Sequence, residues 1–156
     1  MVIVEGLAKI VAAHPLFKGL DQSFYDAVEG CAKNVRFAAD TYLFHEGEDA
    51  NDIYLIREGH VAKEIASPGQ GRMTFQTVTT GGVLGIGAFA PPYRWGFDAI
   101  AREDVRAIMF DATCLRTKCQ ADPALGYTIL KRFLPEMVDR LHDTRVQMLD
   151  LYRARS

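Results

Sequence analysis

The chain has 156 residues, of which 49% are hydrophobic and 24% are charged. A chain of this size and composition can bury one hydrophobic core, so we expect a single globular domain over residues 1–156. The formal net charge of -2 gives no electrostatic reason to expect DNA or an anionic membrane as a partner. No stretch of the sequence is long and apolar enough to predict a membrane span.

The three cysteines, Cys31, Cys114 and Cys119, are odd in number and widely spaced. They match neither a disulfide framework nor a pair of closely spaced metal ligands, so we expect reduced thiols. The N-terminal stretch carries two charged residues, Glu5 and Lys9, within its first turns, which does not match a secretory signal peptide. Both observations favour a cytoplasmic protein.

Two helices are predicted before the first strand. Apolar residues, Val4 among them, recur at helical spacing within residues 2–13, and the proline at position 15 ends this helix. A second, shorter helix is predicted from Asp21 to about Ala32, with Ser23 as the competing N-cap residue.

Between residues 35 and 112 the apolar pattern changes from helical to alternating. Short runs such as "DIYLIREGHVAKEIA" and "VRAIMFDA" are separated by Gly, Pro, Asn or Asp. Glycines fall where tight turns between strands are expected, at Gly47, Gly59, Gly69 and Gly71. This spacing predicts a small β-barrel, roll or sandwich.

Helix is predicted again from residue 113 onward, first as a short piece around Leu115 and then as a long segment from Pro123 to the end. Pro135 lies inside the long segment and cannot donate a backbone hydrogen bond. We therefore expect two helices that meet there, the second beginning near Pro135. The arginines of this segment are interleaved with acidic residues, which indicates a solvated face rather than a nucleic-acid-binding one.

The long C-terminal segment carries an apolar seam whose residues are spaced alternately four and three apart, as in a coiled coil. The seam consists of Leu130, Leu134, Met137, Leu141, Thr144, Met148 and Leu151. It predicts a homodimer through this segment. The alternative is that the same face packs against the chain's own β domain, in which case Phe133, Val138 and Leu149 widen the apolar stripe.

These pieces together resemble the cyclic nucleotide-binding domain, the sensor module of the bacterial catabolite activator family, of cAMP-dependent kinase regulatory subunits and of cyclic nucleotide-gated channels. Four stretches carry the resemblance: "HPLFKGL" (14–20), "YLFHEGEDANDIYLIREGHVAKEI" (42–65), the turn at residues 82–88, and "AIAREDVRAIMFD" (99–111). The closing "DRLHDTRVQMLDLY" looks like the dimer helix of the bacterial regulators.

The resemblance implies an α+β fold, in which a double-stranded β-helix, or jelly-roll-like β-roll, spans residues 35–112 between helices at residues 1–34 and 113–156. It also implies a ligand-sensing regulatory module. The bacterial regulators continue past the dimer helix into a DNA-reading helix-turn-helix. We expect no DNA-binding element here, because the sequence ends at Ser156.

In this family a short helix points its N-terminal amides at the cyclic phosphate, an arginine pairs with that phosphate, and a glutamate accepts a hydrogen bond from the ribose. The family pattern places small residues, Gly85 and Ala88, at the points of close backbone approach. It places Ile86 at the glutamate position and Trp95 at the arginine position. Each lost contact costs roughly 1 to 3 kcal/mol, so we expect cAMP and cGMP to bind weakly.

Arg94 lies one residue before the arginine position and reaches the ligand only if the chain shifts its register by one residue. Aromatic residues at positions 89, 93, 95 and 97 suit either stacking on a flat ligand or filling of the pocket. The candidate ligand-binding residues are Gly85, Ile86, Gly87, Ala88, Arg94, Trp95, Gly96 and Phe97. The expected ligand is a cyclic nucleotide or another small anionic or aromatic molecule, and no other cofactor is expected.

Three other interpretations stay open. An enzyme is the least expected class, because no nucleophile, base and orienting acid occur at a recognisable spacing. A haem or metal sensor of the same fold would need ligands such as His60, Cys31 or Cys114, although no ligand spacing stands out. The third interpretation is a scaffold without ligand, in which the seam recruits a second copy or another protein. In a sensor the pocket behind residues 85–97 is open, whereas in a scaffold it is closed.

Overall fold

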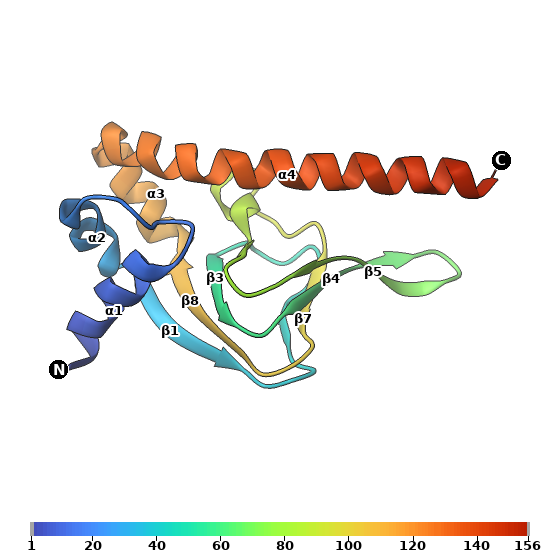
Figure 1. Cartoon of the computed structure of the whole chain (residues 1–156), viewed down its shortest axis with the longest axis horizontal. Helices are drawn as coiled ribbons and strands as arrows, with labels where there is room; N and C mark the ends of the chain where they lie inside the picture. The colour runs from blue at the N-terminus through green and yellow to red at the C-terminus, as the bar shows by residue number, and fades with distance from the viewer. Residues whose placement is uncertain (1, 156) are drawn as a thin grey trace.

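The structure, a computed structural model, describes residues 2–155. A β-roll forms the middle of the chain, with two helices before it and two after it. The last and longest helix runs along one side of the roll and projects beyond it (Figure 1). This is the α+β architecture of a β-roll between terminal helices that the sequence predicted.

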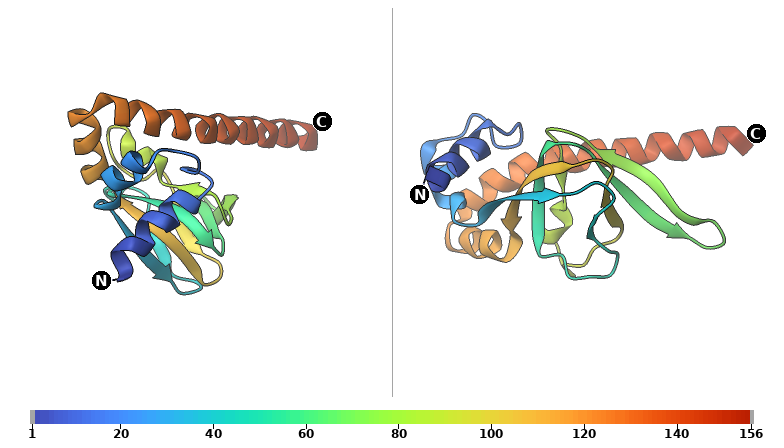
Figure 2. Two further views of the ribbon diagram at one scale, coloured as in Figure 1. Left: turned by 60° about the vertical axis from the view of Figure 1, so that its left-hand side comes forward. Right: turned by 90° about the horizontal axis from the view of Figure 1, so that it is seen from below.

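Among the described residues, eight strands build the roll as two four-stranded antiparallel sheets, seen from two further directions in Figure 2. One sheet has the order β1-β8-β3-β6 and the other has the order β2-β7-β4-β5, so the chain passes back and forth between them. The strands are β1 (Ala32–Phe37), β2 (Tyr42–Phe44), β3 (Asp52–Glu58), β4 (Val61–Ser67), β5 (Gly71–Val78), β6 (Val83–Leu84), β7 (Asp98–Ala101) and β8 (Val105–Asp111). A short 3-10 helix, η1 (Ile86–Phe89), follows β6.

Tight turns join the strands at the glycines that the sequence singled out. Gly47, Gly59, Gly69 and Gly71 all have positive φ angles, as predicted. The turn between β3 and β4 requires glycine for a second reason. A Cβ atom at Gly59 would lie 2.4 Å from the backbone oxygen of Asp104, so the close approach of the turn before β8 leaves no room for a side chain.

The first two helices are α1 (Val2–Ala13) and α2 (Gln22–Glu29), and both were predicted. Asp21 occupies the N-cap position of α2, although its side chain makes no capping hydrogen bond. The helix ends before Ala32 because the backbone from that residue onward pairs with β8. The side chain of Val4 lies outside the part that the structure describes.

The two C-terminal helices are α3 (Ala112–Ala121) and α4 (Pro123–Arg155). The predicted break at Pro135 is wrong, because α4 continues through that residue. A proline inside a helix costs about 3 kcal/mol, so other contacts must hold the helix straight. Hydrogen bonds anchor α4 to the rest of the chain on both sides of the proline, from Arg132 to the Leu16 carbonyl and from Arg140 to the Val83 carbonyl. No helix in the described part has the length and apolarity of a membrane span.

A disulfide bond joins Cys31 to Cys114, whose Cα atoms are 5.6 Å apart, so the expectation of three reduced thiols is wrong. The antiparallel pairing of β1 with β8 puts Ala32 opposite Phe110. The residues that flank these strand ends therefore meet, although the two cysteines are 83 positions apart in the sequence. The number and spacing of cysteines contain no information about this pairing. Cys119 is the free cysteine among the described residues.

We expect a Cys31→Ser, Cys114→Ser variant to have a free energy of unfolding about 2–4 kcal/mol below that of the oxidised protein, because the crosslink restricts a long loop of the unfolded chain. Urea unfolding measures the difference, and Cys119→Ser is the matched control that leaves the crosslink in place. Alkylation of the denatured, unreduced protein should modify Cys119 alone, as measured by mass spectrometry. Modification of all the cysteines would contradict the crosslink.

Candidate functional site

Trp95 occupies the interior of the roll beside the predicted phosphate-binding turn. Its side chain is 5% exposed, and its ring stacks on Phe44 with centroids 3.8 Å apart and planes 13° apart. The indole also lies against Gly85, where a Cβ atom would be 2.8 Å from the ring atom Cη2. Gly85 has a φ of 95°, so its conformation and this contact both require glycine. The indole therefore fills space directly before η1.

The register of the chain around Trp95 decides which neighbouring side chains reach the interior. The Trp95 N–H donates to the Glu48 carbonyl at 3.0 Å, and the Trp95 carbonyl accepts from the Gly47 N–H at 2.8 Å. Arg94 consequently points outward, where its guanidinium donates to the Gly47 carbonyl at 3.0 Å and pairs with the Asp49 carboxylate at 3.2 Å. The register shift that would bring Arg94 to a ligand does not occur.

The other predicted ligand-binding residues are divided between the interior and the surface. Ala88 is fully buried, and its carbonyl accepts a hydrogen bond from Arg116. Phe97 is half-buried, in contact with the ring of Phe44 at 5.4 Å. Gly87 and Gly96 are exposed. Trp95 thus lies against Gly85, and Trp95 and Phe97 both contact Phe44, while Arg94 is excluded from this group.

An apolar groove of about 540 Å³ lies between η1 and α4. Ile86 and Phe89 line it from the η1 side. Phe89 packs edge-on against Phe133 of α4, with ring centroids 5.4 Å apart, and so does not help to fill the predicted pocket. Three seam residues, Leu130, Leu134 and Met137, line the groove from the α4 side.

The apolar residues of the predicted seam on α4 are exposed. Leu134 is 63% exposed, and the remaining exposed members are Leu130, Met137, Leu141, Met148 and Leu151. The alternative interpretation, in which this face packs on the chain's own roll, holds for Phe133 alone, which is buried. Val138 and Leu149 are each 56% exposed.

Sequence reasoning missed a buried cation inside the roll. Lys63 on β4 is 3% exposed, its Nζ atom donates to Gln76 Oε1 at 2.9 Å, and it lies 5.1 Å from the centre of the Phe97 ring. Burial, and to a lesser degree the nearby charge of Arg140 on α4, lower the pKa of Lys63 to about 7. Strand alternation gave no clear signal, because Val61, Ala62, Lys63 and Glu64 of β4 are all buried.

The residues considered as haem or metal ligands are engaged in other interactions. Cys31 and Cys114 form the disulfide, and His60 Nδ1 lies 2.9 Å from a carboxylate oxygen of Glu103. Within residues 2–155 there is no group of three His, Cys, Asp or Glu side chains that could hold a metal ion.

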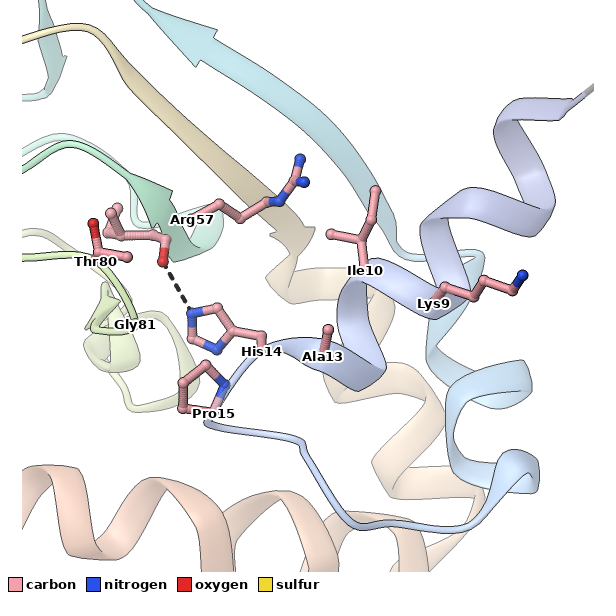
Figure 3. A pocket seen from close by; sticks show the side chains of 9 residues that line it. Lys9, Ile10, Ala13, His14, Pro15, Arg57, Thr80 and Gly81 are labelled. Carbon is pink, nitrogen blue, oxygen red and sulfur yellow. Dashed lines mark hydrogen bonds between the residues drawn. The ribbon is translucent and has the colours of Figure 1, made fainter.

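A second cavity, of about 470 Å³, lies between α1 and the end of β3 (Figure 3). His14 points into the protein beside it and is buried. The Nε2 atom of His14 lies 3.1 Å from the Ile56 carbonyl, and its Nδ1 atom accepts from the Leu16 N–H at 3.2 Å. These two bonds fit a neutral imidazole protonated on Nε2. Burial, followed by the charge of Arg57, lowers the pKa of His14.

The roll, the glycine-led η1 turn and the long α4 define the fold of a regulatory sensor domain. A family model described as "Cyclic nucleotide-binding domain" matches residues 34–122, and the chain belongs to this family. No curated protein matches the chain.

Solved structures show the same fold. A cyclic nucleotide-binding protein from Geobacter metallireducens is 22% identical, with a TM-score of 0.76, over 91% of this chain and 100% of that chain. A cyclic nucleotide-binding domain from Methylobacillus flagellatus is 20% identical, with a TM-score of 0.77, over 94% of this chain and 82% of that chain. The third is the regulatory subunit of a cAMP-independent protein kinase A from Trypanosoma brucei, in a triple mutant bound to cAMP that includes a threonine-to-arginine change. It is 15% identical, with a TM-score of 0.74, over 96% of this chain and 52% of that chain.

The stability of the protein should fall as the pH falls below 6.5, because the unfolded chain then binds a proton that buried, neutral His14 resists. Because the pKa of His14 is lowered in the folded protein, its contribution to the free energy of unfolding is complete above pH 6.5, the value for the unfolded chain. The contribution is lost as the pH falls towards the lower pKa of the folded protein. The slope due to one such group reaches at most about 1.4 kcal/mol per pH unit. Urea unfolding from pH 7.5 to 5 measures it. His14→Gln should show a shallower slope, whereas His142→Gln on exposed α4 should keep the original one.

Proposed function

We propose that residues 1–156 act as one regulatory module of the cyclic nucleotide-binding fold in which Trp95 fills the standard phosphate site, so that cAMP and cGMP bind weakly or not at all. The observation that carries this proposal is the position of the indole, buried against Gly85 and stacked on Phe44. A cyclic phosphate held by η1 would have to occupy the volume that the indole now takes.

The energetic cost of opening this site has several parts. Moving the indole into water would lose roughly 1.5–3 kcal/mol of apolar burial and about 0.5–1.5 kcal/mol of aromatic stacking. The vacated site would still lack a cation for the phosphate, because Arg94 is held outside by Asp49. It would also lack an acceptor for the ribose, because isoleucine occupies position 86.

The trypanosomal relative supports this interpretation by analogy. That protein is the regulatory subunit of a cAMP-independent kinase, and the form bound to cAMP is a mutant that gains an arginine. Arginine is the residue type that the family pattern expects at position 95 of this chain, where tryptophan stands. A protein of this fold that does not respond to cAMP is therefore a sound precedent for a regulatory module with a different input.

We further propose that two copies associate through α4. Its exposed apolar seam is continuous with the groove between η1 and α4, because Leu130, Leu134 and Met137 belong to both. Contiguous apolar surface of this kind on a soluble domain indicates an interaction surface, and the heptad spacing favours a second helix as the partner. In this arrangement α4 is both the dimer contact and the element whose position reports a change inside the roll.

Calorimetric titration tests the filled phosphate site. The natural protein should show no binding of cAMP or cGMP at micromolar concentrations, whereas an Ile86→Glu, Trp95→Arg variant should bind at least about tenfold more tightly, because it regains two charged contacts. An Ile86→Leu, Trp95→Phe variant is the matched control, since it loosens the site without adding charge. Micromolar binding by the natural protein would contradict the proposal.

The dimer should depend on the seam. Light scattering after gel filtration should give about twice the chain mass of 17.4 kDa for the natural protein, and the chain mass itself for a Leu134→Glu, Leu141→Glu variant, because the introduced charges would be buried in the contact. His142→Glu, on the same helix but off the seam, should remain dimeric. If the natural protein is monomeric at high concentration, the proposed association through α4 is wrong.

A further inference from the structure

The cavity between α1 and the end of β3 has walls that are joined at one backbone carbonyl. The Ile56 carbonyl accepts from the Gly81 N–H at 2.9 Å and lies 3.1 Å from Nε2 of His14. It therefore connects the residue after α1, the end of β3 and the turn before β6. These bonds fix the walls without a ligand, as is usual for small-molecule sites.

The cavity has the size and the surface of a site for a small amphipathic molecule. Its volume of about 470 Å³ lies within the range of roughly 300–1,000 Å³ that small-molecule sites occupy. Ile10, Ala13 and Pro15 give it an apolar wall on the α1 side. In Figure 3 the side chains of Ile10 and Ala13 point from α1 towards β3, and Arg57 reaches towards them from the opposite wall. One wall is thus apolar and the other carries a cation.

Arg57 has a weaker partner than two arginines near it on the first sheet. Arg36 and Arg106 each pair with a carboxylate, at 2.6 Å and 3.8 Å. The half-buried Arg57 instead donates to the neutral amide oxygen of Asn34, at 3.3 Å. Among the side chains that the structure describes, no carboxylate forms an ion pair with Arg57. Its guanidinium is therefore available to an anion from outside the chain.

The surroundings of Arg57 are positively charged. Arg57 also lines a smaller hollow of about 360 Å³, together with Asn34, Arg36 and Arg106. Of the described residues that line the two hollows, none is an aspartate or a glutamate. Lys9 adds a charge at the rim of the larger cavity, but its side chain points away from the cavity in Figure 3. Arg57 is thus the cation that faces a ligand in the larger cavity, and a ligand that complements it is an anion.

We propose that this cavity binds a small amphipathic oxyanion, whose charged head pairs with Arg57 and whose apolar body lies against Ile10, Ala13 and Pro15. A guanidinium donates two parallel hydrogen bonds to a carboxylate or a phosphate, so it selects the head group. The inference goes beyond the proposed function, because neither η1 nor α4 contributes a residue to this cavity.

Binding of such a ligand requires little rearrangement of the protein. Arg57 would give up one long hydrogen bond to a neutral amide and gain charge-assisted bonds in its place. The bonds of the Ile56 carbonyl lie on the inner wall and stay as they are. Ala13 and Pro15 are exposed, so the ligand can enter from the solvent.

Calorimetric titration with hexanoate, octanoate and 1-octanol, below the concentrations at which micelles form, tests the site. Octanoate should bind at millimolar concentration or below, about tenfold more tightly than hexanoate, because two further methylene groups are buried. It should also bind about tenfold more tightly than 1-octanol, which has the same apolar body and no charge for Arg57.

Two variants separate the charged contact from the apolar one. Arg57→Met should lower the affinity for octanoate to that for 1-octanol, while its unchanged affinity for 1-octanol shows that the cavity is intact. Lys33→Met, at an exposed strand lysine, is the matched control and should bind both ligands as the natural protein does. Ala13→Phe adds a ring at an exposed position on the cavity wall and should weaken both ligands by about tenfold or more.

The head group is identified by a further titration with octyl phosphate. Tighter binding than that of octanoate assigns a phosphate head to the ligand, and weaker binding assigns a carboxylate head. In both cases the preference should disappear in Arg57→Met, because the selection is made by the guanidinium.

Three results would overturn the inference: no binding of octanoate at millimolar concentration, binding that is unchanged in Arg57→Met, or binding that is unchanged in Ala13→Phe. The last result would place octanoate elsewhere, for example in the groove between η1 and α4. Failure of the proposed function looks different, since tight binding of cAMP would contradict the filled phosphate site and leave the cavity beside α1 unaffected.

Discussion

The contact of Trp95 with Gly85 and Phe44 is the constraint on which this structure depends. The glycine is left-handed and has no side chain, so the indole can lie directly against the backbone before η1. Pairing of Trp95 with the loop at residues 47–48 then fixes the register, which sends Arg94 outward. Ile86, Ala88 and Trp95 all belong to the hydrophobic core. This packing is the reason for proposing that a ligand of this protein is not held by the family's phosphate-binding pair.

The helix α4 is held against the rest of the chain by apolar contacts near its start and by polar contacts further along. Leu125, Ile129 and Phe133 are buried. Arg132, Arg140 and Gln147 each donate a hydrogen bond to a backbone carbonyl elsewhere in the chain. Side-chain bonds to carbonyls can be exchanged for bonds to water at small net cost, whereas an apolar core contact cannot. The helix is thus firmly fixed near Phe133 and adjustable further along, where its seam is exposed.

Much of the fold could be predicted from the sequence, because it depends on local signals. The alternating runs, the turn glycines and the apolar spacing of the helices predicted the roll and its flanking helices, and the loss of charge at positions 86 and 95 was visible in the aligned motif. Three features could not be predicted. The disulfide depends on the β1–β8 pairing, the continuity of α4 through Pro135 depends on anchors at both sides, and the surroundings of Lys63 depend on Gln76 of β5 and the Phe97 ring. Each of these is a property of tertiary contacts between segments far apart in the sequence.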